Sequence, residues 1–213
     1  MNRKTYSVIT ADVVSSREVP SFTATRDRRL KELARLHLAR KWILSPYAIT
    51  AWDEFEVVLA EPEFTPRVIL DLRRVFYPIE LRIAVGIGPA RGVRKEPVNI
   101  HGGGEAFERA RQAAENLKSG SPKFRLLTVF DSGNEIFNVI ANTVYRLQDA
   151  LLQRTTAKQW TAINTQLMTG RQDEAARRLK LDISTVSRNL KRGYYWQLVE
   201  TADAMERIMA AYF

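Results

Sequence analysis

The sequence of 213 residues contains no cysteine and only two histidines. The lack of cysteine excludes disulfide bonds, zinc-finger ligand sets and catalysis by a thiol. His37 and His101 have no partner at metal-ligand or catalytic spacing, so we expect both to be ordinary core or surface residues. No window approaches the roughly 18 apolar residues that a membrane helix needs, which predicts a protein without membrane contact.

The N-terminal segment also lacks the pattern of a secretion signal. Its apolar stretch is interrupted by Thr10 and Asp12, and no small-residue cleavage site follows. We therefore expect a cytoplasmic protein.

Positive charge is in excess. Lys and Arg number 33 against 24 Asp and Glu, which gives a formal net charge of +9. This favours a polyanionic partner, because each Lys or Arg placed on a phosphate releases a condensed counterion. Charge alone does not identify the partner, since many basic proteins carry only a solvated positive face. The basic helix expected at 25–41 has the same alternatives: a solvated face, a scaffold for a partner, or a second patch for DNA backbone.

The periodicity of apolar residues changes along the chain. Five β-rich segments and three helical segments alternate up to Asp131, in the order strand, helix, strand, strand, helix, strand, helix, strand. The expected strands are 6–14, 47–52, 55–60, 81–87 and 124–130, and the expected helices start at 25, 66 and 105. This order predicts an α+β fold, a ferredoxin-like double split unit with one added helix and strand.

After Asp131 the sequence has only helical patterns. We therefore predict a ferredoxin-like domain over 1–133, a connecting helix over 134–156, and an all-α helix-turn-helix DNA-binding domain over 157–213. The last helix, 194–213, has two interpretations: core that packs the helix-turn-helix, or the surface of a homodimer, which two-fold symmetric operators favour.

Residues 172–192, QDEAARRLKLDISTVSRNLKR, carry the helix-turn-helix pattern. Ala176 supplies the small residue that lets the second helix cross the first at close range. Ser184 and Thr185 are expected to cap the second helix through their side-chain oxygens, and Asp182 to bridge the turn. Four apolar residues are expected on the buried side: Leu179, Leu181, Val186 and Leu190. Lys180 takes the turn position that is usually Gly, where a left-handed backbone costs on the order of 1 kcal/mol.

The second helix is expected to enter the major groove of double-stranded DNA. Residues 184–188 resemble the start of recognition helices in bacterial repressors and sigma-like regulators, so Ser184 belongs to the predicted interface. Thr185, Ser187 and Arg188 are candidates for base contacts, with Arg188 suited to a bidentate pair with guanine. Four residues are expected on phosphates: Arg177, Arg178, Lys191 and Arg192. The alternative is an ordinary helical hairpin that packs on the first domain or on a partner.

Two carboxylates of the first domain are candidates for a Mg²⁺ site. Asp12 lies in the first strand and Asp53 at the tip of the expected hairpin, and these strands are neighbours in a double split unit. Mg²⁺ binds through one or two carboxylates plus substrate phosphates. Ser15, Ser16 and Arg17 follow the first strand and could cradle those phosphates. The alternative is a turn-capping or salt-bridging role for both carboxylates.

Residues 12–17, the triplet 53–55, the strand at 81–88 and the helix at 104–111 together resemble the nucleotidyl-cyclase fold. The whole arrangement, with the helix-turn-helix after it, resembles the SatD family of bacterial proteins. The resemblance implies Mg²⁺ with a nucleotide at the first domain, and Arg111 is the phosphate-binding residue that it leaves in place. Trp52 stands where Gly would let a nucleotide approach, and Glu108 stands where the cyclase helix supplies Asn.

We therefore favour a transcription regulator of the SatD type, in which the first domain senses a nucleotide or another small phosphorylated ligand. The alternative is a Mg-dependent nucleotidyl cyclase-like enzyme that carries a helix-turn-helix arm.

Overall fold

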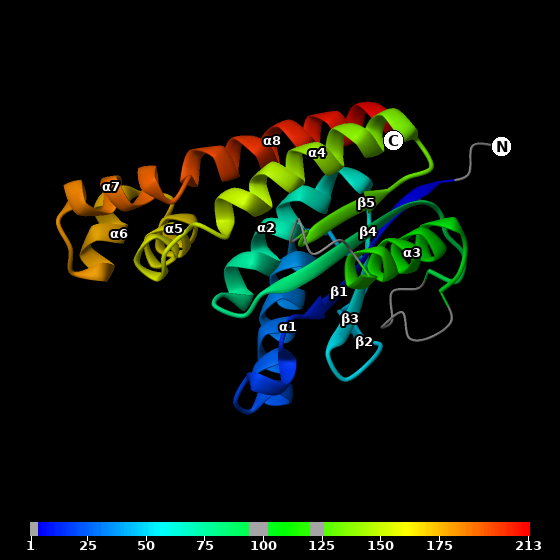
Figure 1. The fold of residues 1–213 in the computed structure, drawn as a ribbon, viewed down its shortest axis with the longest axis horizontal. Helices are drawn as coiled ribbons and strands as arrows, with labels where there is room; N and C mark the ends of the chain where they lie inside the picture. Colours follow the sequence, from blue (N-terminus) through cyan, green and yellow to red (C-terminus); the bar gives the residue numbers. More distant parts are fainter. Residues whose placement is uncertain (1–3, 94–101, 120–125) are drawn as a thin grey trace.

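The computed structural model describes residues 4–93, 102–119 and 126–213, and its centre is a five-stranded mixed sheet (Figure 1). The strands lie in the order β2-β3-β1-β4-β5, with β1 antiparallel to both β3 and β4, and β5 parallel to β4. They are β1 (Thr5–Val13), β2 (Ala48–Ile49), β3 (Glu54–Leu59), β4 (Leu81–Pro89) and β5 (Thr128–Asp131). The first four strands have the ferredoxin-like order, and β5 is the added strand. The predicted α+β class and its ferredoxin-like domain are confirmed.

The central strand β1 is buried on both faces of the sheet because helices cover each side. Ile9 packs toward α1 (Phe22–Ala39) and α2 (Thr65–Phe76), whereas its neighbour Val8 packs toward α3 (Glu105–Ser119). The approach of α3 is so close that a Cβ at Gly86 of β4 would lie 2.0 Å from the Ala106 carbonyl oxygen. Glycine is therefore required at that position.

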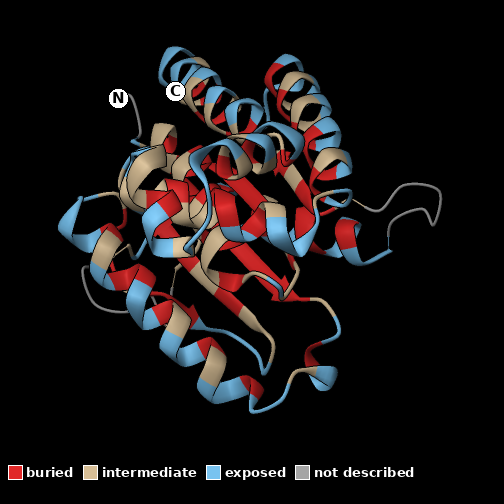
Figure 2. Ribbon diagram, turned by 90° about the vertical axis from the view of Figure 1, so that its left-hand side faces the viewer, coloured by how far each residue is buried: buried red, intermediate tan, exposed pale blue. Residues whose placement is uncertain are grey.

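Two long helices from the C-terminal part of the chain also cover the α1 and α2 face. They are α4 (Glu135–Leu152) and α8 (Tyr195–Tyr212), which run side by side (Figure 1). Tyr145 of α4 and Met205 and Met209 of α8 belong to the same buried cluster as Ile9. Figure 2 shows this arrangement as buried strands and inner helix faces, with exposed residues on the outer faces of the helices.

Helices α5 (Ala157–Thr169), α6 (Gln172–Leu179) and α7 (Ile183–Arg192) form a separate cluster at one end of the molecule (Figure 1). We call these helices the three-helix unit. It is inserted between α4 and α8, so α8 returns from it to the sheet. The first half of this helix, with Leu198 and Ala202, packs on the three-helix unit, as one of the two interpretations of the sequence held. Its second half, with Met205 and Met209, packs in the core over the sheet.

The three-helix unit contacts the sheet part of the molecule through the end of α2. The ring of Tyr77 stacks on that of Trp160 in α5, with 5.3 Å between the centroids. Leu70 of α2 joins the hydrophobic cluster of the unit. None of the helices within 4–93, 102–119 and 126–213 is long and apolar enough to cross a membrane.

A buried ion pair joins α2, α4 and β5 beneath this contact. The guanidinium of Arg73 donates to Asp149 and to the Thr128 hydroxyl, and all three side chains are buried. Asp149 also accepts from the amide of Leu127 at 2.9 Å. Burial raises the pKa of Asp149, while the charge of Arg73 and the bonds from Leu127 and Thr128 oppose that rise.

We expect Asp149→Ala to lower the free energy of unfolding by about 3–5 kcal/mol, because it leaves the Arg73 charge buried without its partner. Urea denaturation followed by circular dichroism measures this. The double variant Arg73→Met, Asp149→Leu is the control and should be clearly more stable than the single variant. A loss below about 1 kcal/mol for Asp149→Ala would contradict the role of this pair.

Candidate functional site

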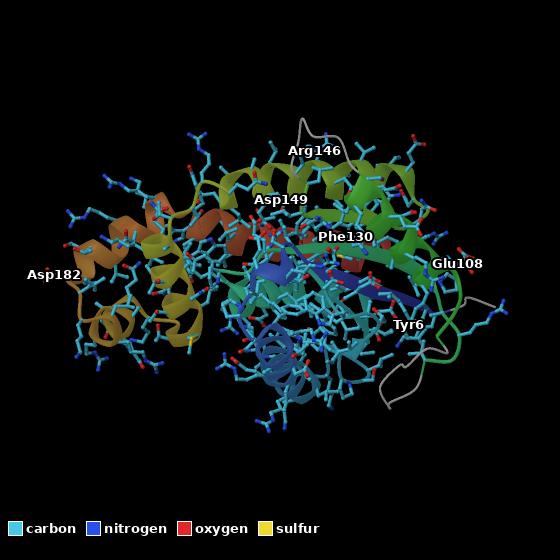
Figure 3. The ribbon with its side chains drawn as sticks, turned by 60° about the horizontal axis from the view of Figure 1, so that its bottom comes forward. Tyr6, Glu108, Phe130, Arg146, Asp149 and Asp182 are labelled. Atoms are coloured by element: carbon cyan, nitrogen blue, oxygen red, sulfur yellow. The ribbon has the colours of Figure 1, made fainter. Side chains whose placement is uncertain are left out.

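The structure has two helices joined by a short turn at residues 172–192. Helix α6 ends at Leu179, and Lys180 has the left-handed backbone expected of it, with φ 54° and ψ 44°. The amide of Leu181 donates to the Ala176 carbonyl at 3.0 Å, which closes the end of α6. Asp182, at the outer end of the molecule (Figure 3), is extended and precedes the first residue of α7.

Small and branched residues hold these helices against α5. Ala175, Ala176, Val186 and Leu190 are buried, and a Cβ on Gly193 would lie 2.9 Å from Ile163 Cδ1. This close approach allows the two helices and α5 to share one core.

Two expectations about the turn are wrong. Leu181 is 44% exposed rather than pinned to the core, because Leu179 takes the inward position just before the left-handed residue. Ser184 and Thr185 do not cap α7 either. The helix already begins at Ile183, before both of them, and the side chain of Asp182 at its N-cap makes no capping bond.

The outer side of α7 carries the polar residues predicted for DNA. Ser184 and Arg188 are exposed, while Thr185 and Ser187 are partly buried. Arg188 Nη2 donates to Thr185 Oγ1 at 3.0 Å, which holds the guanidinium along the helix. In the described part of the chain no carboxylate lies within 4 Å of the charged ends of Arg188, Lys191 or Arg192. These three cations therefore leave the α7 surface positive.

Arg177 and Arg178 lie on α6 and differ from the α7 cations. Arg177 is 3.6 Å from Asp173, and Arg178 is 2.9 Å from Glu174, one turn earlier in each case. Exposed pairs of this kind contribute little and are easily exchanged for another anion. Both arginines remain exposed at the edge of the same surface.

The second candidate site lies where β1 ends. Asp12 is buried, and its carboxylate accepts from Arg82 Nη1 at 2.9 Å. Arg82 lies on β4, directly opposite Asp12. On the other side of Asp12, Glu54 of β3 is the residue directly opposite it. Burial raises the pKa of Asp12; the charges of Arg82 and Lys118 oppose the rise, and those of Asp53 and Glu54 add to it.

Asp53 reaches the same end of the sheet. Its side chain accepts from the Ser16 hydroxyl at 3.2 Å, and its carbonyl accepts from the amide of Val13 at 3.0 Å. The structure therefore brings Asp12, Asp53 and Ser16 into one neighbourhood, as the sequence pattern indicated. Arg82 and Lys118 are the residues that the pattern missed, and only the strand register could have revealed Arg82.

One oxygen of each carboxylate is already engaged, Asp12 Oδ2 by Arg82 and Asp53 Oδ2 by Ser16. A Mg²⁺ ion held by one or two carboxylates and substrate phosphates would have to share this site with the Arg82 guanidinium, whose positive charge opposes a second cation there. No group of three or more acidic, histidine or cysteine side chains in the described part of the chain could hold a metal. We therefore derive no catalytic step through a metal here.

The proposed ligand residues are divided between two places. Ser15 is exposed with a left-handed backbone, and Arg17 is exposed beside it on a 3-10 turn (Ser16–Glu18). Ser15 borders a hollow of about 510 Å³ that also contacts Arg29 and the segment 78–80. Arg111 lies on α3, where its charge lowers the pKa of Glu56 against the rise caused by burial. In the described residues no hydrogen bond or ion pair joins Arg111 to residues 15–17.

Two departures from the cyclase pattern have definite positions. Trp52 is half exposed, with its ring 4.8 Å from that of Phe22. Glu108 lies near the start of α3 and borders the same hollow as Tyr6, which is near the start of β1 (Figure 3). Asp12 is near the other end of that strand. The charge of Glu108 therefore does not act on the Asp12 neighbourhood, and Lys118 at the other end of α3 lies there instead.

His37 is a core residue, and His101 lies outside the described residues. The ring of His37 is buried between the Tyr47 hydroxyl at 2.9 Å and Asp71 at 3.2 Å. It joins α1 to α2.

No family model and no curated protein sequence matches the chain. Among solved structures, the chain is similar to the crystal structure of a regulator of polyketide synthase expression from Bifidobacterium adolescentis. The sequences are 14% identical, the match covers 97% of this chain and 82% of that chain, and the TM-score is 0.32. A likeness at this level carries no conclusion about function.

We expect Lys180→Gly to raise the free energy of unfolding by about 1 kcal/mol, because glycine adopts the left-handed conformation without a Cβ clash. The control is Lys180→Ala, which removes the same charge but keeps the Cβ, and should give no comparable gain. Urea denaturation measures both. Equal stability of the two variants would show that the turn carries no such cost.

Proposed function

We propose that this chain is a sequence-specific DNA-binding protein, a cytoplasmic transcription regulator of the SatD type that acts as a homodimer. The three-helix unit would bind double-stranded DNA, and the sheet domain would sense a nucleotide or another small phosphorylated ligand. The proposed domains are 1–133, the connecting helix 134–156, and 157–213, with α8 returning to the sheet. The observation that carries this proposal is the α7 surface, where unpaired cations and small hydroxyl residues lie outside a buried apolar side.

The residues that contact bases would lie toward the start of α7. A recognition helix places its N-terminal residues on base edges in the major groove, and Ser184, Thr185 and Ser187 have the short hydroxyl side chains that fit there. Arg188 can present two parallel N–H donors to guanine O6 and N7, which is the commonest specific contact.

Phosphate contacts would flank this region. Among the described residues, Lys191 and Arg192 at the end of α7 have no carboxylate partner, so they can bind phosphate without breaking an ion pair. Arg177 and Arg178 on α6 would exchange their weak pairs for phosphates. Such contacts position the protein and make binding salt-dependent, but carry no sequence information.

The recognition residue is tested after an operator has been selected from random DNA with the purified protein. We expect Arg188→Ala to weaken operator binding by about 1–3 kcal/mol, roughly tenfold to a hundredfold, and to relax the preference at one base pair. Lys191→Ala should weaken operator and unrelated DNA equally and lower the slope of log K against log salt by about one unit. Fluorescence anisotropy over a salt series measures both.

The matched control is Arg207→Ala, an exposed arginine of α8 on the half of that helix far from the three-helix unit. It removes the same charge and should leave the base preference intact. If Arg188→Ala retains the operator affinity and base preference of the wild type, α7 is not the recognition helix. If no sequence is enriched by selection, the protein does not bind DNA specifically.

Ligand sensing is the second part of the proposal, and the hollow beside Ser15 supports it. Arg29 borders this hollow together with the carboxylates Glu18 and Glu80, and the exposed Arg17 lies next to Glu18 in the chain. The positive charge for a phosphate would therefore come from Arg29 and Arg17. Because the Arg82 guanidinium already neutralises Asp12, we propose that the ligand binds without a metal.

We expect a nucleotide or inorganic phosphate to raise the unfolding temperature in the presence of EDTA, since a ligand at 100 times its Kd stabilises the folded state by about 2.7 kcal/mol. Arg17→Ala should remove the shift and Arg207→Ala should keep it. Differential scanning fluorimetry with the four ribonucleoside triphosphates and phosphate measures this. No shift with any of them, in a protein that still binds its operator, would end the sensing part and leave the DNA-binding part standing.

A further inference from the structure

The outer side of α4 carries an apolar stripe that no residue within 4–93, 102–119 or 126–213 covers. Ile136, Val139 and Leu147 are 67%, 61% and 64% exposed. With the exposed Thr143 and Ala150 between and after them, they follow the spacing i, i+3, i+7, i+11 and i+14. At 3.6 residues per turn these positions lie within about 80° of one side of the helix. Large apolar side chains gathered in this way mark an interaction surface.

Charges of opposite sign lie on one flank of this stripe, at its two ends. Glu135 in the first turn and Arg146 about three turns later are both exposed, and they fall within about 20° of each other around the helix. Neither forms an ion pair with any residue in the described segments. Arg146 lies at the outer edge of the molecule in Figure 3.

A shallow hollow follows the same flank. It has a volume of about 480 Å³, and both Glu135 and Arg146 border it together with Val139 and Thr143. Its shape allows side chains of another helix to enter beside the stripe. The surface therefore combines an apolar centre, unpaired charges and a groove.

We propose that a second copy of this chain covers the stripe, with the two α4 helices packed antiparallel about a two-fold axis. A two-fold interface must be complementary to itself, and this one is. An axis midway between Ile136 and Leu147 places Ile136 of one protomer opposite the partner's Leu147. It also places Glu135 about 3 Å along the helix axis from the partner's Arg146, at a rise of about 1.5 Å per residue.

A partner of different sequence is less well matched to this surface. The acidic group is at the start of α4 and the basic group is further along, so an antiparallel copy pairs unlike charges on both sides of the axis. A parallel copy would place the two charged flanks on opposite sides of the interface, so no unlike pair would form across it. The inference specifies the surface and geometry of the homodimer, and it does not depend on whether the chain binds DNA.

The lack of cysteine makes this arrangement directly testable. Thr143→Cys places one thiol on each protomer close to the two-fold axis. The two thiols are offset by about 4.5 Å in the direction of the helices, which is within reach of a disulfide or a short thiol crosslinker. We expect mild oxidation to convert most of this variant into a covalent dimer at micromolar concentration. Met168→Cys, on a residue of α5 that is 63% exposed, is the matched control and should stay monomeric on a reducing-agent-free gel.

Sedimentation equilibrium tests the energetics of the same surface. Leu147→Glu should raise the dissociation constant of the dimer by at least about a hundredfold, because the change occurs twice in a symmetric dimer. Met168→Glu should leave it unchanged. Glu135→Arg should weaken the dimer, and the double variant Glu135→Arg, Arg146→Glu should restore it, since the swap regenerates both unlike pairs.

A wild-type chain that remains monomeric at 100 μM would overturn the proposal. A dimer that Leu147→Glu leaves intact, or that Met168→Cys crosslinks as fast as Thr143→Cys, would place the interface elsewhere and would equally overturn it. All these positions are exposed, and circular dichroism of each variant verifies that the fold is retained. A monomeric chain would also remove the homodimer from the proposed function, but it would leave the DNA-binding part standing, because that part is measured by Arg188→Ala.

Discussion

Both ends of the three-helix unit are anchored to the sheet, and the rest of the structure depends on this constraint. The helix that enters it, α4, is held by the buried ion pair of Asp149 with Arg73 and by the ring of Tyr145 against Phe130, 4.8 Å apart. The helix that leaves it, α8, inserts Met205 and Met209 into the core over the sheet. Arg67 of α2 also pairs with Asp203 and Glu206 on α8. The orientation of α7 is therefore set by packing against the sheet domain rather than by a free linker.

The same constraint fixes the directions in which the two sides of α4 face. Its inner side, with Phe137 and Tyr145, belongs to the core over the sheet, so the helix cannot rotate without breaking that core. Its outer side is then presented in a fixed direction. If a second copy packs there, the two α7 helices are related by one rigid axis, and the spacing of the DNA half-sites follows from the length of α4. A regulator built in this way would read two half-sites at one separation.

The sequence predicted the parts of the fold that depend on local pattern. The β-branched runs at β1 and β4 and the order of the elements were sufficient for the ferredoxin-like class, and the unusual Lys180 marked the turn. Contacts between distant segments were not accessible. Nothing local places Arg82 opposite Asp12, because that depends on the register of β1 against β4. The apolar pattern of α8 was consistent with packing on the helix-turn-helix, but it could not show that the second half of the helix also packs on the sheet.

The segment between α2 and β4 offers a physical connection between the sheet domain and the three-helix unit. On one side, residues 78–80 border the hollow beside Ser15, and the Glu80 carbonyl accepts from the amide of Val14 at 3.0 Å. On the other side, Tyr77 stacks on Trp160, and residues 77–81 border a second hollow of about 210 Å³ that reaches Arg73 and Thr155. A ligand in the first hollow would press on the same short segment whose other side supports α5. Any influence of the ligand on α7 would require that this segment has two arrangements, one of which the ligand favours. Because it contacts both the hollow beside Ser15 and Trp160, this segment offers the most direct route for such a coupling.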